Sequence, residues 1–241
     1  KHLRELLEAH FNAYETVFVI TESVFSMDGD YPDLPGLLQL QKKHQFILMV
    51  DEAHSLGVLG ETGRGLAELQ SVPRNEGEVI WMGTLSKSMA SCGGYLAGSS
   101  RFINFLKHSL PGFVYSVGLT PPNAASALTA LKILRREPQR VQRLRDISKH
   151  FQYLLKGAGL DTGSGAGIAI FPVFLDDPHE TMRVNEQLHL AGVEGSGHPG
   201  LVVGSPTRHA GAAKAPACGG PAPVRVLVPG EPPERELNRG L

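Results

Sequence analysis

The sequence has few of the residues that define several common protein classes. Its 241 residues include only two cysteines, Cys92 and Cys218, which are too few for a disulfide framework and lack metal-ligand spacing. We therefore expect two free thiols in a reducing compartment, and a cytoplasmic protein. No apolar run is long enough to span a bilayer, and the first residues show no signal-peptide pattern.

Charge of either sign is not in excess. The chain carries 23 Lys and Arg residues against 24 Asp and Glu residues, a formal net charge of −1 at pH 7. This balance argues against a nucleic-acid-binding surface and against a polybasic contact with a membrane. Hydrophobic residues make up 41% and charged residues 20%, ordinary values for a soluble globular protein of one or two domains.

Two short apolar runs each end in reactive polar side chains. The run FILMV leads to Asp51 and His54, and the run VIWM leads to Thr84 and Lys87. Unbroken apolar runs of this length are typical of strands buried on both faces of a parallel sheet. Because ligands bind at the carboxyl edge of open parallel sheets, we expect the polar side chains that end both runs to lie on one rim.

An acid and a lysine on one rim indicate a particular chemistry. A lysine amine can form a Schiff base with an aldehyde cofactor, most obviously pyridoxal phosphate, and a carboxylate can keep the proton on the nitrogen of the cofactor ring. Lys87 and Asp51 are the candidates for these two roles. Each also has an ordinary structural interpretation, because an Asp after a strand often caps a turn and a Lys in a Gly/Ser-rich loop is usually solvated. The order strand, Asp-x-x-His, strand, Thr-x-x-Lys favours the functional interpretation.

The rest of the chain alternates predicted strands and helices. A strand, a helix beginning at Asp33 with Pro35 in its first turn, and the strand before Asp51 predict a crossover unit with parallel strands. Expected helices are 2–10, 33–44, 101–109, 121–136, 138–155 and 179–190, and expected strands are 16–21, 46–50, 79–82, 93–98 and 168–175.

Three ordered motifs resemble those of one enzyme family. They are TESVFSMDGDYPDL (21–34), DEAHSLGVLGETGRG (51–65) and GTLSKSMASCGGYLAG (83–98), and together they closely resemble the α-oxoamine synthases. The resemblance runs from about Lys1 to Val193. It implies an α/β fold-type I pyridoxal-phosphate transferase, with residues 1–136 as the C-terminal part of a large, mostly parallel cofactor domain and residues 137–241 as a small C-terminal α/β domain.

The resemblance also implies an activity and its participants. Family members are homodimers that condense an amino acid with an acyl thioester, of CoA or of acyl carrier protein, to a 2-amino-3-oxo product and carbon dioxide. Two alternatives stay open: another fold-type I transferase such as an aminotransferase, and a catalytically silent, truncated partner chain. An aminotransferase would react with the amino acid alone, whereas a synthase requires the thioester.

Individual roles follow from the matching positions. The resemblance places Asp51 at the ring nitrogen, Lys87 at the Schiff base, Thr84 at the phosphate, and both His54 and Ser26 at the phenolic oxygen. It also places Ser116, with Thr120 as rival, at the phosphate of the partner subunit's cofactor. Ser26 has an alternative as a turn residue before Asp28 and Gly29.

The glycine-rich stretch between the second motif's His54 and Gly65 matches neither a P-loop nor a dinucleotide fingerprint. We assign it to substrate access or to the subunit interface. Arg64, within it, is a candidate for binding an anion, and a surface salt bridge is the favoured alternative.

The two ends of the chain depart from the family pattern. Residues 194–223 are rich in Gly, Ala and Pro and indicate a flexible insertion, a linker, or sequence from altered splicing or a reading-frame change. Arg225 then stands where the family has an arginine for the amino-acid carboxylate, with a solvated strand-end arginine as an equal alternative. Lys1 aligns with the middle of the family's large domain, so we expect a fragment that lacks an upstream glycine-rich phosphate loop and a side chain stacked on the cofactor ring.

Overall fold

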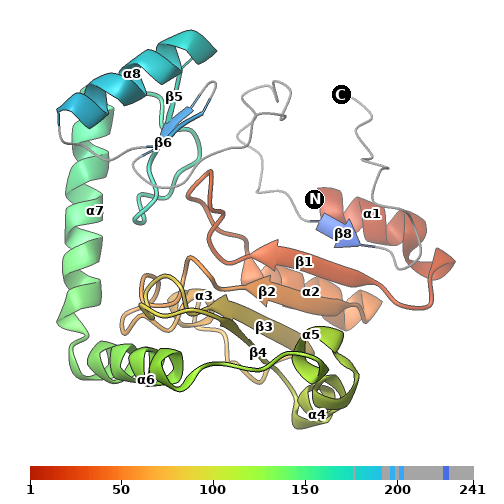
Figure 1. Cartoon of the computed structure of the whole chain (residues 1–241). Helices are drawn as coiled ribbons and strands as arrows, with labels where there is room; N and C mark the ends of the chain where they lie inside the picture. The colour runs from red at the N-terminus through yellow and green to blue at the C-terminus, as the bar shows by residue number, and fades with distance from the viewer. Residues whose placement is uncertain (176, 192–195, 199–200, 204–224, 228–241) are drawn as a thin grey trace.

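A computed structural model describes residues 1–175, 177–191, 196–198, 201–203 and 225–227 (Figure 1). The helices are α1 (His2–His10), the short 3-10 helix η1 (Phe11–Ala13), α2 (Leu34–His44), α3 (Leu66–Leu69), α4 (Ser100–Ser109), α5 (Pro111–Val114), α6 (Pro121–Arg136), α7 (Gln139–Gly157) and α8 (Pro178–Leu190). The strands are β1 (Phe18–Glu22), β2 (Ile47–Asp51), β3 (Val79–Thr84), β4 (Gly94–Ala97), β5 (Pro172–Phe174), β6 (Ser196–His198), β7 (Leu201–Val203) and β8 (Arg225–Leu227).

The larger of two sheets has the strand order β4-β3-β2-β1-β8. Its three central strands run parallel, and the two edge strands β4 and β8 run antiparallel to their neighbours. The parallel register sets Glu22 beside Asp51, and Asp51 beside Met82, at the carboxyl ends of the strands. The predicted α/β fold with a mostly parallel sheet is confirmed.

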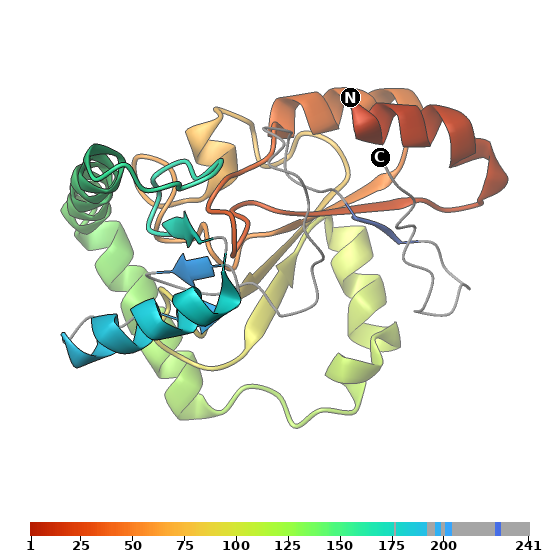
Figure 2. The ribbon, with the colours of Figure 1, turned by 90° about the horizontal axis from the view of Figure 1, so that it is seen from above.

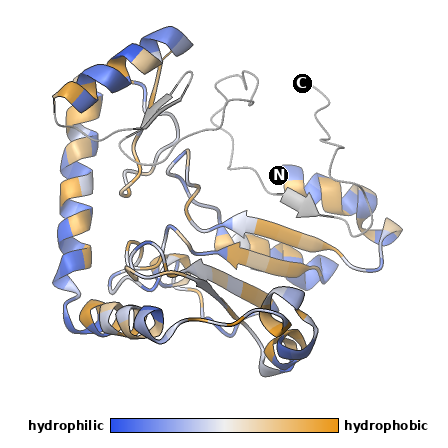
Figure 3. Cartoon of the chain, viewed as in Figure 1, coloured by the Kyte–Doolittle hydropathy of each residue, from blue (hydrophilic) through white to orange (hydrophobic). Residues whose placement is uncertain are grey.

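The hydrophobic core lies between this sheet and the helices α1 and α2, which run along one of its faces (Figure 2). Hydrophobic residues accordingly concentrate on the central strands, while the helices alternate hydrophobic and hydrophilic residues (Figure 3). Val19, Leu48 and Val50 are fully buried in it. Alternate strand residues such as Met49 stay partly exposed. The expectation that the strands are buried on both faces is met in β3, whose first three residues are all buried. In β1 and β2 burial alternates, so these strands are buried on one face only.

Helix α2 begins as its sequence predicts. The carboxylate of Asp33 accepts a hydrogen bond from the backbone N–H of Gly36 at 3.0 Å, and Pro35 occupies the first turn. The helix ends at Gln45, whose left-handed conformation (φ 53°) lets the chain turn directly into β2. The predicted helix 33–44 is confirmed, as is the helix that starts at Pro121 and ends at Arg136.

The C-terminal part holds a second sheet of order β5-β7-β6, next to α8. The predicted strand 168–175 is shorter in the structure, because Ile168 and Ile170 form an isolated bridge around Ala169, whose φ is 53°. Two pieces of the segment predicted to be irregular, 194–223, are strands β6 and β7, and its other residues lie outside the described ones. The predicted domain boundary after residue 136 remains a prediction. Strand β8, assigned to the small domain, pairs with β1 of the larger sheet.

Across the described ranges of the chain, none of the helices combines the length and apolar character needed to cross a membrane.

Replacing a central core side chain should cost far more stability than the same change at the surface. Leu48 is 0% exposed and Leu190 is 80% exposed. We expect Leu48→Ala to lower the free energy of unfolding by about 2–5 kcal/mol, through lost burial and the cavity left behind. Leu190→Ala should change it by less than about 0.5 kcal/mol. Urea denaturation measures both, and equal losses would show that the core is not centred on β2.

Candidate active site

Lys87 and His54 meet at the carboxyl edge of the central strands. His54 lies in the turn after β2, Lys87 lies in the turn after β3, and Lys87 Nζ is 2.6 Å from His54 Nε2. They line one pocket of about 240 Å³, which apolar side chains complete. Its lining residues are Ala53, His54, Leu56, Val58, Lys87, Ser88, Ala169 and Ile170. The predicted convergence of the two strand ends is therefore present.

The environment alters the proton affinity of both side chains. Burial, and then the charge of Lys87, lowers the pKa of His54 to about 4. The imidazole is therefore neutral at pH 7, and its Nε2 can accept the hydrogen bond that Lys87 donates. Burial also lowers the pKa of Lys87, against the opposing pull of Asp51 and Glu22. A lowered pKa makes the lysine amine a better nucleophile, as covalent attachment to an aldehyde requires.

Asp51 ends β2 and directs its carboxylate toward the same edge. One carboxylate oxygen, Oδ1, accepts a hydrogen bond from the backbone N–H of Ala53 at 2.8 Å. Within the described part of the chain, the structure shows no hydrogen bond to the other oxygen. The backbone of Ala53 thus orients the Asp51 carboxylate through Oδ1, and Oδ2 can accept a hydrogen bond from a ligand.

Thr84 presents a hydroxyl pair with Ser86 at the end of β3. Their side-chain oxygens are 2.7 Å apart, and Thr84 Oγ1 also accepts from the backbone N–H of Ser86 at 3.2 Å. The side chains are held by the turn rather than by the core. Hydroxyls of this kind are suitable donors to a phosphate.

Ser26 lies in the turn after β1, where its backbone N–H donates to Glu22 Oε2 at 3.0 Å. No hydrogen bond links Ser26 to Lys87 or His54 among the described residues. Its predicted role at the phenolic oxygen stays a prediction.

Two further predicted residues lie away from this cluster. Among the described residues, Ser116 forms hydrogen bonds only with Phe113 and Gly118, at 3.4 Å each, in a segment whose Tyr115 is 86% exposed. Its rival Thr120 precedes α6 as the N-cap residue, without a side-chain capping bond. Both positions were expected to serve a partner subunit, so neither is tested by a single chain.

The two predicted arginines have different surroundings. Arg225 belongs to β8, where its backbone is in register with Ile20 of β1. Arg64 makes its contacts through the backbone: its N–H donates to Glu68 Oε2 at 2.9 Å, and its carbonyl accepts from Arg74. In the described ranges its guanidinium forms no ion pair, so the favoured surface salt bridge is not found.

Sequence analysis missed Glu22 at this site. It ends β1 beside Asp51, and burial, reinforced by the Asp51 charge, raises the pKa of its carboxyl. Its signal was available, because it follows an apolar strand as Asp51 does.

Fold and site together define a fold-type I pyridoxal-phosphate transferase. The family of aminotransferases of class I and II matches residues 1–193, and the chain belongs to that family. Among curated relatives, the 8-amino-7-oxononanoate synthase of Petrotoga mobilis is 39% identical over 189 residues, which cover 78% of this chain and 47% of the relative. The chain spans about half the length of the curated relatives it matches.

Solved structures support the same placement. The 8-amino-7-oxononanoate synthase of Francisella tularensis superimposes with a TM-score of 0.69 at 25% identity, covering 83% of this chain and 59% of that one. The serine palmitoyltransferase of Sphingomonas wittichii gives a TM-score of 0.75 at 27% identity, covering 83% and 52% respectively. Both names belong to the α-oxoamine synthases, so the resemblance inferred from the three motifs is confirmed.

The lowered pKa of His54 predicts how stability depends on pH. Above its ordinary pKa of 6.5 the imidazole is neutral in both the folded and the unfolded chain, so its titration does not change the free energy of unfolding. As the pH falls from 6.5 toward 4, the unfolded chain binds a proton that the folded chain does not, so the free energy of unfolding decreases. We expect His54→Gln to make this decrease shallower in urea denaturation.

The same substitution at His108, exposed on α4, is the matched control. An unchanged slope in His54→Gln would show that His54 is not buried against Lys87.

Proposed function

We propose that this chain is part of an α-oxoamine synthase and carries its catalytic lysine at the carboxyl edge of the sheet. Such an enzyme condenses an amino acid with an acyl thioester and releases carbon dioxide. The observation that carries the proposal is the 2.6 Å approach of Lys87 Nζ to His54 Nε2, at the strand edge where Asp51 also lies. A lysine that only stabilises the fold is usually paired with a carboxylate or solvated, whereas Lys87 contacts a neutral imidazole and burial lowers its pKa.

The residues present fit pyridoxal phosphate. Lys87 supplies the amine for covalent attachment, the half-exposed carboxylate of Asp51 suits the protonated ring nitrogen, and the hydroxyls of Thr84 and Ser86 suit the phosphate. His54 and Ser26 are proposed for the phenolic oxygen. The bound cofactor supplies an electron sink for the substrate's α-carbon.

The chain's own side chains then have distinct tasks. With the cofactor bound, Asp51 would hold the proton on the ring nitrogen by its negative charge. Lys87 would move a proton at the α-carbon of the amino acid, for which its lowered pKa suits it. Neutral His54 accepts a hydrogen bond from the lysine and thereby keeps the amine directed into the pocket.

The family resemblance and the names of the relatives support one class of substrates. We propose an amino acid and an acyl thioester of CoA or acyl carrier protein, a 2-amino-3-oxo product, and a homodimer in which Ser116 reaches the partner's cofactor phosphate. Arg225 is proposed for the carboxylate of the amino acid.

An aminotransferase is the second candidate, because the matched family is described by that activity. The two functions differ in one requirement. An aminotransferase converts the cofactor with the amino acid alone, whereas a synthase releases carbon dioxide only when the acyl thioester is present as well.

Covalent trapping tests the anchor of the cofactor. We expect pyridoxal phosphate followed by borohydride to leave a pyridoxyl group on the peptide that contains Lys87, located by mass spectrometry. Lys87→Ala should abolish this adduct, whereas Lys107→Ala, at an exposed lysine of α4, should leave it in place. An adduct spread evenly over surface lysines would contradict a specific site and leave the silent partner chain as the remaining interpretation.

A second measurement tests the reaction. With L-serine or L-alanine carrying a labelled carboxyl group, we expect labelled carbon dioxide only when acetyl-CoA or palmitoyl-CoA is added. Asp51→Asn should reduce this release by at least about 100-fold, because the neutral amide cannot hold the proton on the ring nitrogen. Conversion of the cofactor by the amino acid alone would favour the aminotransferase.

A further inference from the structure

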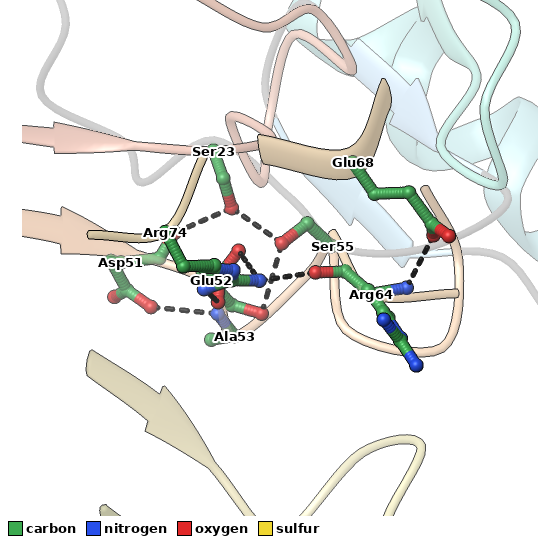
Figure 4. A network of polar contacts seen from close by, with 8 residues as sticks. All are labelled: Ser23, Asp51, Glu52, Ala53, Ser55, Arg64, Glu68 and Arg74. Atoms are coloured by element: carbon green, nitrogen blue, oxygen red, sulfur yellow. Dashed lines mark hydrogen bonds and ion pairs between the residues drawn. The ribbon is translucent and has the colours of Figure 1, made fainter. Parts of the chain in front are cut away.

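An ion pair between a buried carboxylate and a partly exposed arginine lies directly beneath the turn that carries His54. Glu52, between Asp51 and His54, has a side chain that is only 1% exposed. Both of its carboxylate oxygens accept hydrogen bonds from Arg74, at 2.6 Å and 3.0 Å (Figure 4). A buried carboxylate is costly unless it is paired, and the forked guanidinium is the partner that matches both of its oxygens.

Arg74 joins three separate pieces of the chain. Besides the carboxylate of Glu52 at the end of β2, its guanidinium donates to the backbone carbonyl of Arg64 at the far end of the glycine-rich loop. Its guanidinium carbon also lies 4.2 Å from the ring centroid of Trp81 in β3, in a cation–π contact. The Arg74 side chain thus connects both ends of the glycine-rich loop to β2 and β3, the strands that lead to His54 and Lys87.

The backbone of Glu52 also stabilises the turn that carries His54. The carbonyl of Glu52 accepts from the N–H groups of Ser55 and Leu56, both at 3.1 Å, so His54 sits inside this tight turn. Ser55 Oγ accepts at 2.7 Å from Ser23 Oγ, which ties the turn to the end of β1. At Gly65 (φ +91°) a Cβ atom would collide with Glu52 Oε1, so the loop closes directly over the carboxylate.

We propose that Glu52 and Arg74 are positioning residues: their ion pair holds the loop from residue 53 to residue 65 in the one arrangement that brings His54 Nε2 to Lys87 Nζ. Neither side chain lines the pocket, so they act through His54 and not on a ligand. The role in catalysis rests on the proposed function, but the positioning of His54 is measurable without any ligand.

The titration of His54 reports its position. The charged group that faces it is Lys87, from the turn after β3, and Asp51 and Glu22 in turn face Lys87 from β2 and β1. The neighbouring residues Ala169 and Ile170 of the pocket are apolar. If the loop moves, His54 becomes better solvated and leaves the lysine, and both changes allow it to bind a proton more readily.

The experiment follows the His54 ring proton by NMR as a function of pH in the 241-residue chain, with the resonance identified by its loss in His54→Gln. We expect Arg74→Met to raise the midpoint by about one pH unit or more from its value near 4 in the parent chain. Arg136→Met, which removes an exposed ion pair with Glu137 at the end of α6, is the matched control and should leave the midpoint unchanged.

A second Arg74 variant and a measurement of thermal stability distinguish a positioning role from a structural one. If Arg74→Met does not fold, Arg74→Lys retains the charge but loses the fork, and it should give a smaller rise in the same direction. A folded Arg74 variant with lowered thermal stability but an unchanged His54 midpoint would overturn the proposal, because the ion pair would then be structural only. A shifted midpoint in a chain that forms no pyridoxyl adduct would uphold the positioning role and reject the proposed function.

Discussion

The parallel register of β1, β2 and β3 is the constraint on which the site depends. Because the strands run in one direction and are aligned at their ends, their last residues share one edge of the sheet. Glu22, Asp51 and the turn with Lys87 therefore come from three separated parts of the sequence and still share one electrostatic environment. A shift of one residue in β2 would turn Asp51 to the other face of the sheet and dismantle the site.

Partial burial gives these charges their chemical character. In water, the side chains of Lys87, His54 and Glu22 would each titrate independently. At this edge desolvation disfavours their charged forms, lowering the pKa of His54 and Lys87 and raising that of Glu22. The edge thus holds a neutral imidazole beside an activated amine, while the fully buried Glu52 is stabilised by Arg74 and excluded from the pocket.

Local rules predicted the individual elements well. Asp33 with Pro35 begins α2, and two prolines begin α6, because capping and the fixed φ of proline act within a few residues. The rules did less well in the C-terminal part. The predicted strand after residue 168 is interrupted at Ala169, and β6 and β7 form in a stretch with no periodic pattern. Short strands of this kind depend on which partner is nearby, and a local pattern does not record that.

The sequence by itself determined the family, the central strands and helices, and the chemical types at the edge: the acid, the imidazole, the hydroxyl and the lysine. Their reactive character was decided only by the tertiary structure, since a pKa depends on burial and on neighbours distant in sequence. Lys87 and His54 are 33 residues apart along the chain and 2.6 Å apart in space. Arg74 carried no motif of its own, and folding alone placed it against Glu52, because a buried carboxylate requires a partner wherever the chain can supply one.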